Sequence, residues 1–163
     1  MIFITVGTDR PFDRLVKVVD NWVQRTARND VVAQIGRGGW RPQSMRAVEF
    51  IEPPEFARYF QQADVVISHA GMGTILSALH HGKPLIVMPK LASLGEHRNE
   101  HQTATARKMM AIHGVAVAFN EVDLENQLGR ISELEPPRRI GQSASDSLLR
   151  GVREFIFHKV RQA

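Results

Sequence analysis

Hydrophobic residues along the chain fall into two kinds of cluster, short unbroken runs and longer stretches with helical spacing. The short runs are rich in β-branched residues and nearly continuous in apolar character, which favours strands that are buried on both faces of a sheet. There are six of them, at Ile2–Val6, Val31–Ile35, Ala47–Ile51, Asp64–Ser68, Pro84–Met88 and Val115–Phe119. The sequence therefore predicts about six parallel strands.

Helical spacing fills most of the gaps between these runs. From Phe12 to Val23 apolar residues recur three or four positions apart, and Pro11 stands where a helix can begin. Further helices are predicted at Pro54–Gln62, Met72–Leu79, Glu100–Ile112 and Val122–Leu134. Only Gly36–Pro42, a hairpin-like span, joins two strands without a helical pattern. Alternation of strands and helices predicts right-handed crossovers and an α/β, Rossmann-like fold with three layers, α/β/α.

The end of the chain differs from this α/β pattern in both sequence and charge. Tandem prolines, Pro136-Pro137, end the alternation because they cannot continue a helix. Residues 1–137 contain fifteen basic and fifteen acidic residues, so the net charge of +4 lies entirely in residues 138–163. We therefore predict an α/β domain at residues 1–137 and, within 138–163, a basic amphipathic helix over Ser143–Val160. Such a helix suits a partner, an anionic membrane surface or packing on its own domain.

Length and composition exclude several classes of protein. A chain of 163 residues with 43% hydrophobic residues suffices for one globular domain, but not for the two nucleotide-binding domains of a two-lobed cleft. No apolar run approaches the roughly 20 residues of a membrane span, no basic secretory start is present and there is no cysteine. We therefore expect a cytoplasmic protein. The neutral body lacks the basic stripe of nucleic-acid-binding domains, so no nucleic-acid partner is expected.

The strongest candidate ligand site is a glycine-containing turn between a predicted strand and a predicted helix. Its sequence is Ser68-His69-Ala70-Gly71-Met72-Gly73-Thr74, and Gly7-Thr8 follows the first strand in the same way. Ligands of open α/β sheets bind at these carboxyl ends of strands. Glycines admit a close approach to the backbone, and free N–H groups at a helix N-terminus favour anions. The turn matches neither the dinucleotide fingerprint nor the P-loop. Two interpretations therefore remain open, a diphosphate site and a tight strand-to-helix turn without a ligand.

A polar loop after the next predicted strand is the second candidate. Its residues would contact sugar hydroxyls and phosphates, or would simply form a solvated helix start. The candidates for such contacts are Lys90, Glu96, Arg98, Asn99, His101 and Gln102. The run His97-Arg98-Asn99-Glu100-His101 also has the His-x-x-Glu-His spacing of one class of zinc peptidases. A zinc site would need a distant acidic ligand, for which Glu154 is the candidate.

Three segments in series closely resemble the C-terminal, donor-binding domain of glycosyltransferase family 28. They are Ile67–Leu76, Gly82–Pro89 and His101-Gln102. Phe3–Thr8 and Gln34–Gly38 are similar to the small subunit of two-subunit members of the family, and Leu94–Gln102 is similar to the bacterial exopolysaccharide versions of that subunit. The resemblance covers roughly residues 1–120.

This resemblance implies one lobe of a GT-B transferase that is divided between two chains. The present chain would hold a nucleotide diphosphate sugar, with a UDP-sugar as the expected donor, and would act as a hexosyltransferase only with its partner. A second, membrane-associated subunit would recruit a lipid-linked saccharide in exopolysaccharide assembly and would keep this chain at the inner face of the cytoplasmic membrane. Self-association is plausible when that partner is absent. A non-catalytic nucleotide-sugar sensor or scaffold is the alternative.

The same resemblance implies roles for individual residues. Gly7 and Thr8 would line the cleft, and the turn from Ser68 to Thr74 would surround the diphosphate. His101 and Gln102 would reach the donor sugar, with Lys90 or Arg98 adding positive charge. His69 and His101 are this chain's candidates for a general base, although the partner could supply it. Ser77 stands where family members commonly have a glutamate that holds the ribose. No cofactor or metal is expected, because GT-B enzymes stabilise the leaving diphosphate with positive groups and helix N-termini.

Overall fold

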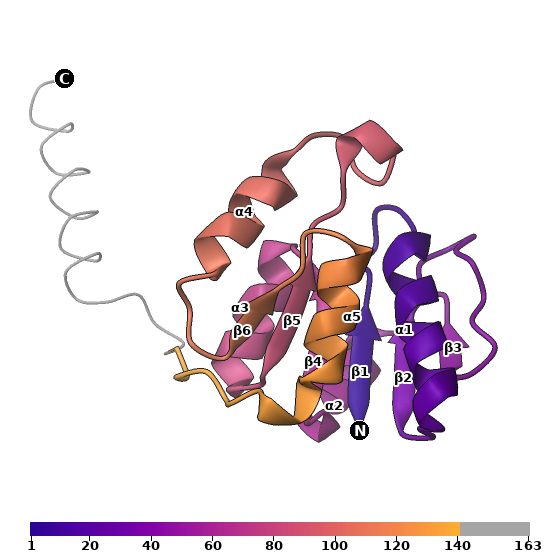
Figure 1. Cartoon of the computed structure of the whole chain (residues 1–163), viewed down its shortest axis with the longest axis horizontal. Coiled ribbons are helices and arrows are strands. Elements are labelled where there is room, and N and C mark those ends of the chain that lie inside the picture. The colour runs from indigo at the N-terminus through magenta and orange to yellow at the C-terminus, as the bar shows by residue number, and fades with distance from the viewer. Residues whose placement is uncertain (141–163) are drawn as a thin grey trace, which may run out of the picture.

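A six-stranded parallel sheet forms the centre of the protein, with helices on both of its faces (Figure 1). The computed structural model describes residues 1–140. The strands are β1 (Ile2–Thr5), β2 (Val31–Gln34), β3 (Arg46–Val48), β4 (Val65–His69), β5 (Leu85–Met88) and β6 (Val115–Val117). They lie in the order β3-β2-β1-β4-β5-β6, and every ladder is parallel. The predicted α/β fold, with the strand order of a Rossmann-like lobe, is confirmed.

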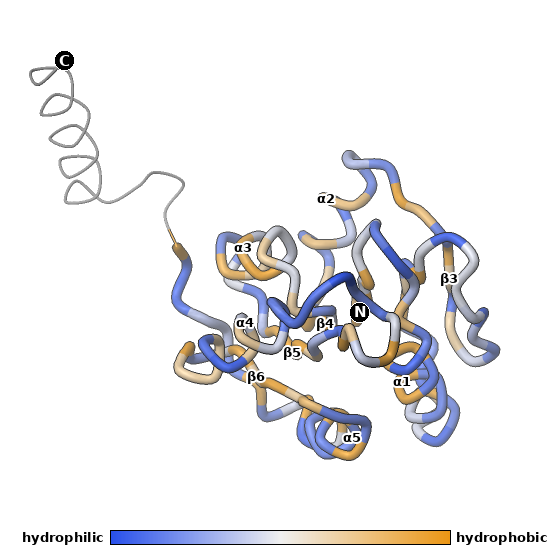
Figure 2. The backbone as a smooth tube through the Cα atoms, turned by 90° about the horizontal axis from the view of Figure 1, so that it is seen from above, coloured by the Kyte–Doolittle hydropathy of each residue, from blue (hydrophilic) through white to orange (hydrophobic). Residues whose placement is uncertain are grey.

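Five helices and two short 3₁₀ turns connect the strands within residues 1–140. They are α1 (Asp13–Thr26), α2 (Pro53–Gln62), α3 (Met72–His81), η1 (Ala92–Leu94), α4 (His101–Met109), α5 (Glu121–Gly129) and η2 (Ile131–Glu133). Viewed from above, α1 and α5 lie on one side of the strands and α2 and α3 on the other (Figure 2). Right-handed crossovers that run in opposite directions from the centre of the sheet place the helices in this way, and side chains of each strand alternate between the two faces. Ile2 and Ile4 of β1 pack in the cluster of α1 and α5, whereas Phe3 packs in that of α2, α3 and α4.

Two predicted features of the β2–β3 region are wrong, and the sheet register explains both. The span Gly36–Pro42 is not a hairpin, because β2 and β3 run parallel. The third strand covers Arg46–Val48 and does not reach Ile51, because its partner β2 ends at Gln34, opposite Val48. Residues 49–51 are thus released from the ladder and pass over the carboxyl end of the sheet.

Two helices are shorter than predicted. Helix α4 ends at Met109, before a turn in which the amide of Ile112 donates to the carbonyl of Met109. Helix α5 ends at Gly129, the residue of that stretch with the poorest helix propensity. The predicted basic helix at Ser143–Val160 lies outside the described residues, so it stays a prediction, as does the domain boundary at residue 137. Within residues 1–140, none of the helices combines the length and apolar character needed to cross a membrane.

Candidate functional site

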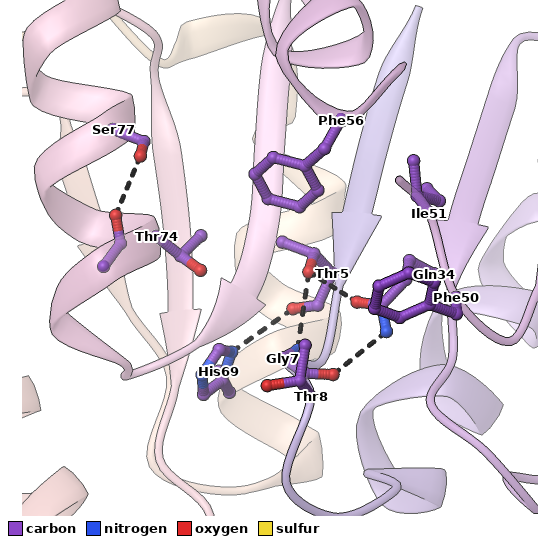
Figure 3. A pocket seen from close by; sticks show the side chains of 11 residues that line it. Thr5, Gly7, Thr8, Gln34, Phe50, Ile51, Phe56, His69, Thr74 and Ser77 are labelled. Atoms are coloured by element: carbon purple, nitrogen blue, oxygen red, sulfur yellow. Dashed lines mark hydrogen bonds between the residues drawn. The ribbon is translucent and has the colours of Figure 1, made fainter. Parts of the chain in front are cut away.

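A cavity of about 390 Å³ opens at the carboxyl ends of β1, β2 and β4 (Figure 3). Strands β1 and β4 are neighbours in the sheet, but the chain continues from β1 toward β2 and from β4 toward β5. The cavity therefore lies at the point where the strand order reverses, which is where open α/β sheets bind ligands. Its lining residues are Thr5, Gly7, Thr8, Gln34, Phe50, Ile51, Phe56, His69, Gly73, Thr74 and Ser77.

A buried hydrogen-bond network around Gln34 fixes the floor of this cavity. The hydroxyl of Thr5 donates to Gln34 Oε1 at 2.7 Å, and Gln34 Nε2 donates to the carbonyl of Gly7 at 2.9 Å and to that of Glu49 at 3.2 Å. One side chain thus joins the loop after β1 to the segment after β3. Satisfied buried networks of this kind hold a single geometry, so the cavity is preformed on this side.

His69 lines the cavity, and two glycines make room for its ring. A Cβ atom at Gly71 would lie 2.2 Å from His69 Nε2, and one at Gly7 would lie 2.7 Å from it. Both positions therefore need glycine to make room for the imidazole. The sequence had suggested another reason, that the glycines let a ligand approach the backbone closely. A Cβ at Gly73 would meet nothing within 4 Å. Gly73 therefore remains the glycine of the turn whose backbone is open to a ligand.

The environment of His69 keeps its imidazole neutral. Burial lowers the pKa of His69 from 6.5 to about 4, and the positive charge of Lys90 adds to this effect. His69 Nδ1 lies 3.4 Å from the carbonyl oxygen of Thr5, which assigns the ring proton to Nδ1 and leaves Nε2 as an acceptor. A group with so low a pKa is a weak general base at neutral pH, because proton transfer is most effective when the pKa is near the working pH.

The shifted pKa of His69 predicts a pH dependence of stability. Between the folded value of about 4 and the ordinary value of 6.5, the unfolded chain binds a proton that the folded chain does not. Stability should therefore fall as the pH drops through this window, by about 1 kcal/mol from pH 7 to pH 5.5 through this residue. Urea unfolding of the wild type and of His69→Asn at both pH values measures this loss as a difference between the two proteins. Equal losses would show that His69 is not held neutral.

One end of the cavity is apolar and aromatic. Ile51 and Phe56 line it, and the ring of Phe56 packs edge-on against Phe3 with 5.4 Å between ring centroids. Phe50 lies at the same end with 47% of its surface exposed, so its ring has a free area at the cavity mouth. Aromatic side chains in such positions suit the flat face of a heterocyclic base.

The other end of the cavity is formed by the start of α3. Gly73 and Thr74 lie in its first turn, where backbone N–H groups have no partner within the helix. The N-cap residue, Gly71, offers these groups no side-chain hydrogen bond. One turn further on, the hydroxyl of Ser77 donates to the carbonyl of Gly73 at 2.9 Å. Helix α3 therefore presents donors at its N-terminus and hydroxyl groups along the side of the cavity.

Lys90 and Gln102, which the sequence predicted at the ligand, are buried away from the cavity. Lys90 is 1% exposed, and its Nζ donates to the carbonyl of Arg10 in the loop after β1. Burial lowers the pKa of Lys90 to about 8. The backbone amide of Lys90 donates to Gln102 Oε1 at 3.1 Å. Both side chains therefore tie loops together and do not line the cavity.

The rest of the polar loop is also engaged with its surroundings. Glu96 forms a two-pronged ion pair with Arg14 of α1, with both N–O distances at 2.9 Å. Arg98 pairs with Asp9 at 3.2 Å, and Asn99 Oδ1 accepts from the backbone amide of His101. His101 is exposed at the first position of α4. None of these four predicted residues lines the cavity.

The structure brings together six of the predicted site residues: Gly7, Thr8, His69, Gly73, Thr74 and Ser77. Ser68, Ala70, Gly71 and Met72 belong to the same turn but do not line the cavity. Sequence reasoning missed five residues that do: Thr5, Gln34, Phe50, Ile51 and Phe56. Position in the sequence could have identified two of them, because Thr5 and Gln34 lie at the ends of predicted strands, at the same edge of the sheet as the glycine turn.

In the described part of the chain, no three His, Asp or Glu side chains converge in a way that could hold a metal ion. His97, the first residue of the His-x-x-Glu-His run, has Nδ1 at 3.1 Å from the carbonyl oxygen of Asn99.

A doubly wound sheet with a cavity at its switch point is an architecture that GT-B glycosyltransferase lobes share with other nucleotide-binding proteins. Residues 1–147 match the glycosyltransferase family 28 C-terminal domain, and the chain belongs to this family. Over 110 residues, 60% of this chain, it is 39% identical to the UDP-N-acetylglucosamine transferase subunit ALG13 of Mus musculus. It spans only 9% of the length of that relative.

Two solved structures show the same fold. The solution structure of ALG13 superimposes with a TM-score of 0.60 at 22% identity, covering 85% of this chain and 89% of that one. The glycosyltransferase of kitacinnamycin superimposes with a TM-score of 0.61 at 18% identity, covering 80% of this chain and 34% of that one. The present fold thus corresponds to most of the ALG13 structure and to about a third of the kitacinnamycin enzyme.

Proposed function

We propose that this chain is the donor-binding, catalytic subunit of a hexosyltransferase that uses a nucleotide diphosphate sugar, with UDP as its nucleotide. The observation that carries the proposal is the two-ended cavity at the switch point, with an aromatic wall at one end and the open N-terminus of α3 at the other. The aromatic wall suits a heterocyclic base, and the helix N-terminus suits a diphosphate. Similarity to a UDP-N-acetylglucosamine transferase subunit supports uridine as the nucleoside.

In this arrangement the base lies against Phe50, Ile51 and Phe56, and the diphosphate accepts hydrogen bonds from the first amides of α3. The helix N-terminus then stabilises the negative charge that develops on the leaving diphosphate, without a metal ion. The donor sugar extends past Gly73 toward the open edge of the sheet. Neutral His69 supports the loop after β1 and accepts hydrogen bonds through Nε2.

The acceptor half of the enzyme is proposed to come from a second, membrane-associated chain that presents a lipid-linked saccharide for exopolysaccharide assembly. The name of the mouse relative, a transferase subunit, supports an enzyme of more than one chain. The general base is also assigned to that chain, because His69 is a weak base and His101 lies outside the cavity lining. The present chain would thus bind UDP alone and would transfer sugar only with its partner.

Alanine in place of Phe50 should weaken UDP binding about fivefold or more, since a stacked base contributes about 1–3 kcal/mol. Isothermal titration calorimetry on the isolated chain measures this change. Leu94→Ala is the matched control, because Leu94 is also exposed, at 59%, but lies outside the cavity lining. Wild-type protein that does not bind UDP, or equal effects of the two variants, would contradict the proposed site.

Co-expression with a candidate membrane-associated partner chain, followed by a transfer assay with UDP-sugars, tests the catalytic part of the proposal. We expect sugar transfer from the pair and little from either chain alone. Full turnover by the isolated chain would refute the divided enzyme. UDP binding without transfer by any pairing would instead favour a nucleotide-sugar sensor.

A further inference from the structure

The loop after β1 carries two residues of the cavity wall, Gly7 and Thr8, and its own backbone does little to hold it in place. Helix α1 begins only at Asp13, so residues 7–11 lie outside any helix or strand. Among the described residues, no main-chain group of residues 7–11 forms a hydrogen bond with another main-chain group. The position of this part of the wall therefore depends on side chains that bond to the loop.

Two buried side chains reach the loop from other parts of the fold. Gln34 donates to the carbonyl of Gly7 at 2.9 Å. Lys90, which is 1% exposed, donates through Nζ to the carbonyl of Arg10. Thr8 lies between the two residues that are held in this way. The shape of the loop at Thr8 is thus set by Gln34 from one side and by Lys90 from the other.

The ammonium group of Lys90 depends on the loop as much as the loop depends on it. Lys90 follows β5, and β4 lies between β5 and β1 in the sheet, so the contact spans the end of β4 (Figure 1). Nζ also lies 5.9 Å from the ring centroid of Phe12, the residue before α1. In the part of the chain that the structure describes, no carboxylate forms an ion pair with Lys90. A buried ammonium that lost the Arg10 carbonyl would be costly, so the loop is held where that carbonyl meets Nζ.

The other polar contacts of the loop are exposed to solvent and hold it weakly. Asp9 pairs with Arg98 at 3.2 Å, but the two side chains are 40% and 74% exposed. Arg10 Nη1 donates to the carbonyl of Gly95 at 2.8 Å in an exposed setting. Water competes for such contacts, and they contribute little. Lys90 therefore provides the buried hydrogen bond that fixes the loop beyond Thr8.

We infer that Lys90 is a positioning residue for nucleotide binding, whose buried ammonium holds the loop after β1 so that Gly7 and Thr8 form the cavity wall. This inference rests on the proposed function, since it requires a nucleoside diphosphate in the cavity. It gives Lys90 an effect on the ligand through the loop, in place of the direct contact that the sequence suggested.

The charge of Lys90 gives this role a pH dependence. Burial lowers the pKa of Lys90 to about 8, although the nearby carboxylates of Asp9 and Glu96 favour its charged form and Arg10 opposes it. Lys90 thus loses its proton between pH 7 and pH 9, whereas carboxylate and guanidinium groups keep their charge and His69, at the end of β4, is already neutral. A neutral amine is a weaker donor than an ammonium. The hold on the loop, and with it the affinity for UDP, should therefore fall as the pH rises through this window.

Lys90→Met tests the inference, because it removes the ammonium and keeps an apolar stem. A buried charge replaced by an apolar side chain of similar size is often tolerated, so we expect this variant to fold, as circular dichroism will show. At pH 7 its affinity for UDP should fall about fivefold, as for the loss of one hydrogen bond. Amide hydrogen exchange of residues 7–12 in the ligand-free chain should become at least about fivefold faster.

Lys83→Met is the matched control. Lys83 Nζ also donates to main-chain carbonyls, those of Gln61 and Ala63, both at 2.7 Å, but these contacts lie at the opposite edge of the sheet, before β4 and β5. This variant should leave both the affinity for UDP and the exchange of residues 7–12 unchanged.

Calorimetric titration of the full chain with UDP at pH 7 and pH 9 completes the test. The advantage of the wild type over Lys90→Met should largely disappear at pH 9. Equal affinities at pH 7, or an advantage that does not change with pH, would overturn the inference while leaving the proposed function intact. Weaker UDP binding with unchanged exchange would also overturn it, because the ammonium would then act on the phosphates through its charge. If the wild type does not bind UDP at pH 7, the proposed function itself fails, and the inference with it.

Discussion

Alanine at position 7 should remove most of the UDP binding of the chain and lower its free energy of unfolding by about 2 kcal/mol. Gly7 has φ of +78°, a left-handed conformation that costs about 1–2 kcal/mol for a residue with a Cβ atom. The new Cβ would also lie 2.7 Å from Nε2 and Cε1 of His69. His69 lines the cavity, so movement of its ring to relieve this contact changes the shape of the site. We expect UDP affinity to fall more than tenfold.

Gly38→Ala separates the cost of the left-handed backbone conformation from the effect of the contact with His69. Gly38 has φ of +70°, which is nearly the same backbone conformation, but a Cβ there would meet nothing within 4 Å. Its replacement should cost about 1 kcal/mol and leave UDP binding unchanged. Urea unfolding followed by circular dichroism gives the stability of both variants, and calorimetry gives their affinity for UDP. Equal losses in stability and unchanged UDP binding in both variants would show that Gly7 is required only for its backbone conformation and not for His69.

The fold was predictable because the pattern that specifies it is local. Buried strands such as β1 and β5 are continuous apolar runs, and the spacing from Phe12 onward matches one face of a helix. The position of the site followed from the same pattern, since the carboxyl ends of parallel strands form one edge. Identification of Gly73 and Thr74 needed only the order of elements along the chain.

The composition of the site was less predictable, because it depends on contacts between distant segments. Phe50 and Ile51 were assigned to a strand by their hydrophobicity, and only the early end of β2 places them at the cavity. Lys90 and Glu96 were expected at the ligand because their polar loop follows the next predicted strand, at the same edge of the sheet as the glycine turn. Their burial depends on partners at Arg10 and Arg14, about 80 residues earlier in the chain. The local sequence pattern does not indicate a contact between residues that are so far apart in the chain.

Loss of the Glu96 carboxylate should destabilise the protein without changing its affinity for the nucleotide. The side chains of Arg14 and Glu96 are only 12% and 13% exposed, and Glu96 Oε2 also accepts from the backbone amide of Leu91 at 2.9 Å. Breaking a well-buried pair by removing one partner costs about 3–5 kcal/mol, and the residual exposure of this pair reduces that figure. We therefore expect Glu96→Gln to lower the free energy of unfolding by about 2 kcal/mol, measured by urea unfolding.

Arg98→Gln is the control for this change, because it removes a pair that the solvent screens. Arg98 is 74% exposed and its partner Asp9 is 40% exposed, so the loss should stay below about 0.5 kcal/mol. Titration with UDP and with UDP-N-acetylglucosamine then distinguishes a structural role of Glu96 from the sugar contact that its sequence context suggested. If Glu96 only joins the loop after β5 to α1, Glu96→Gln and the wild type should bind each ligand with equal affinity. If Glu96 instead contacts the donor sugar, Glu96→Gln should bind UDP-N-acetylglucosamine more weakly, bind UDP as before and keep its stability. That result would show that Glu96 belongs to the binding site.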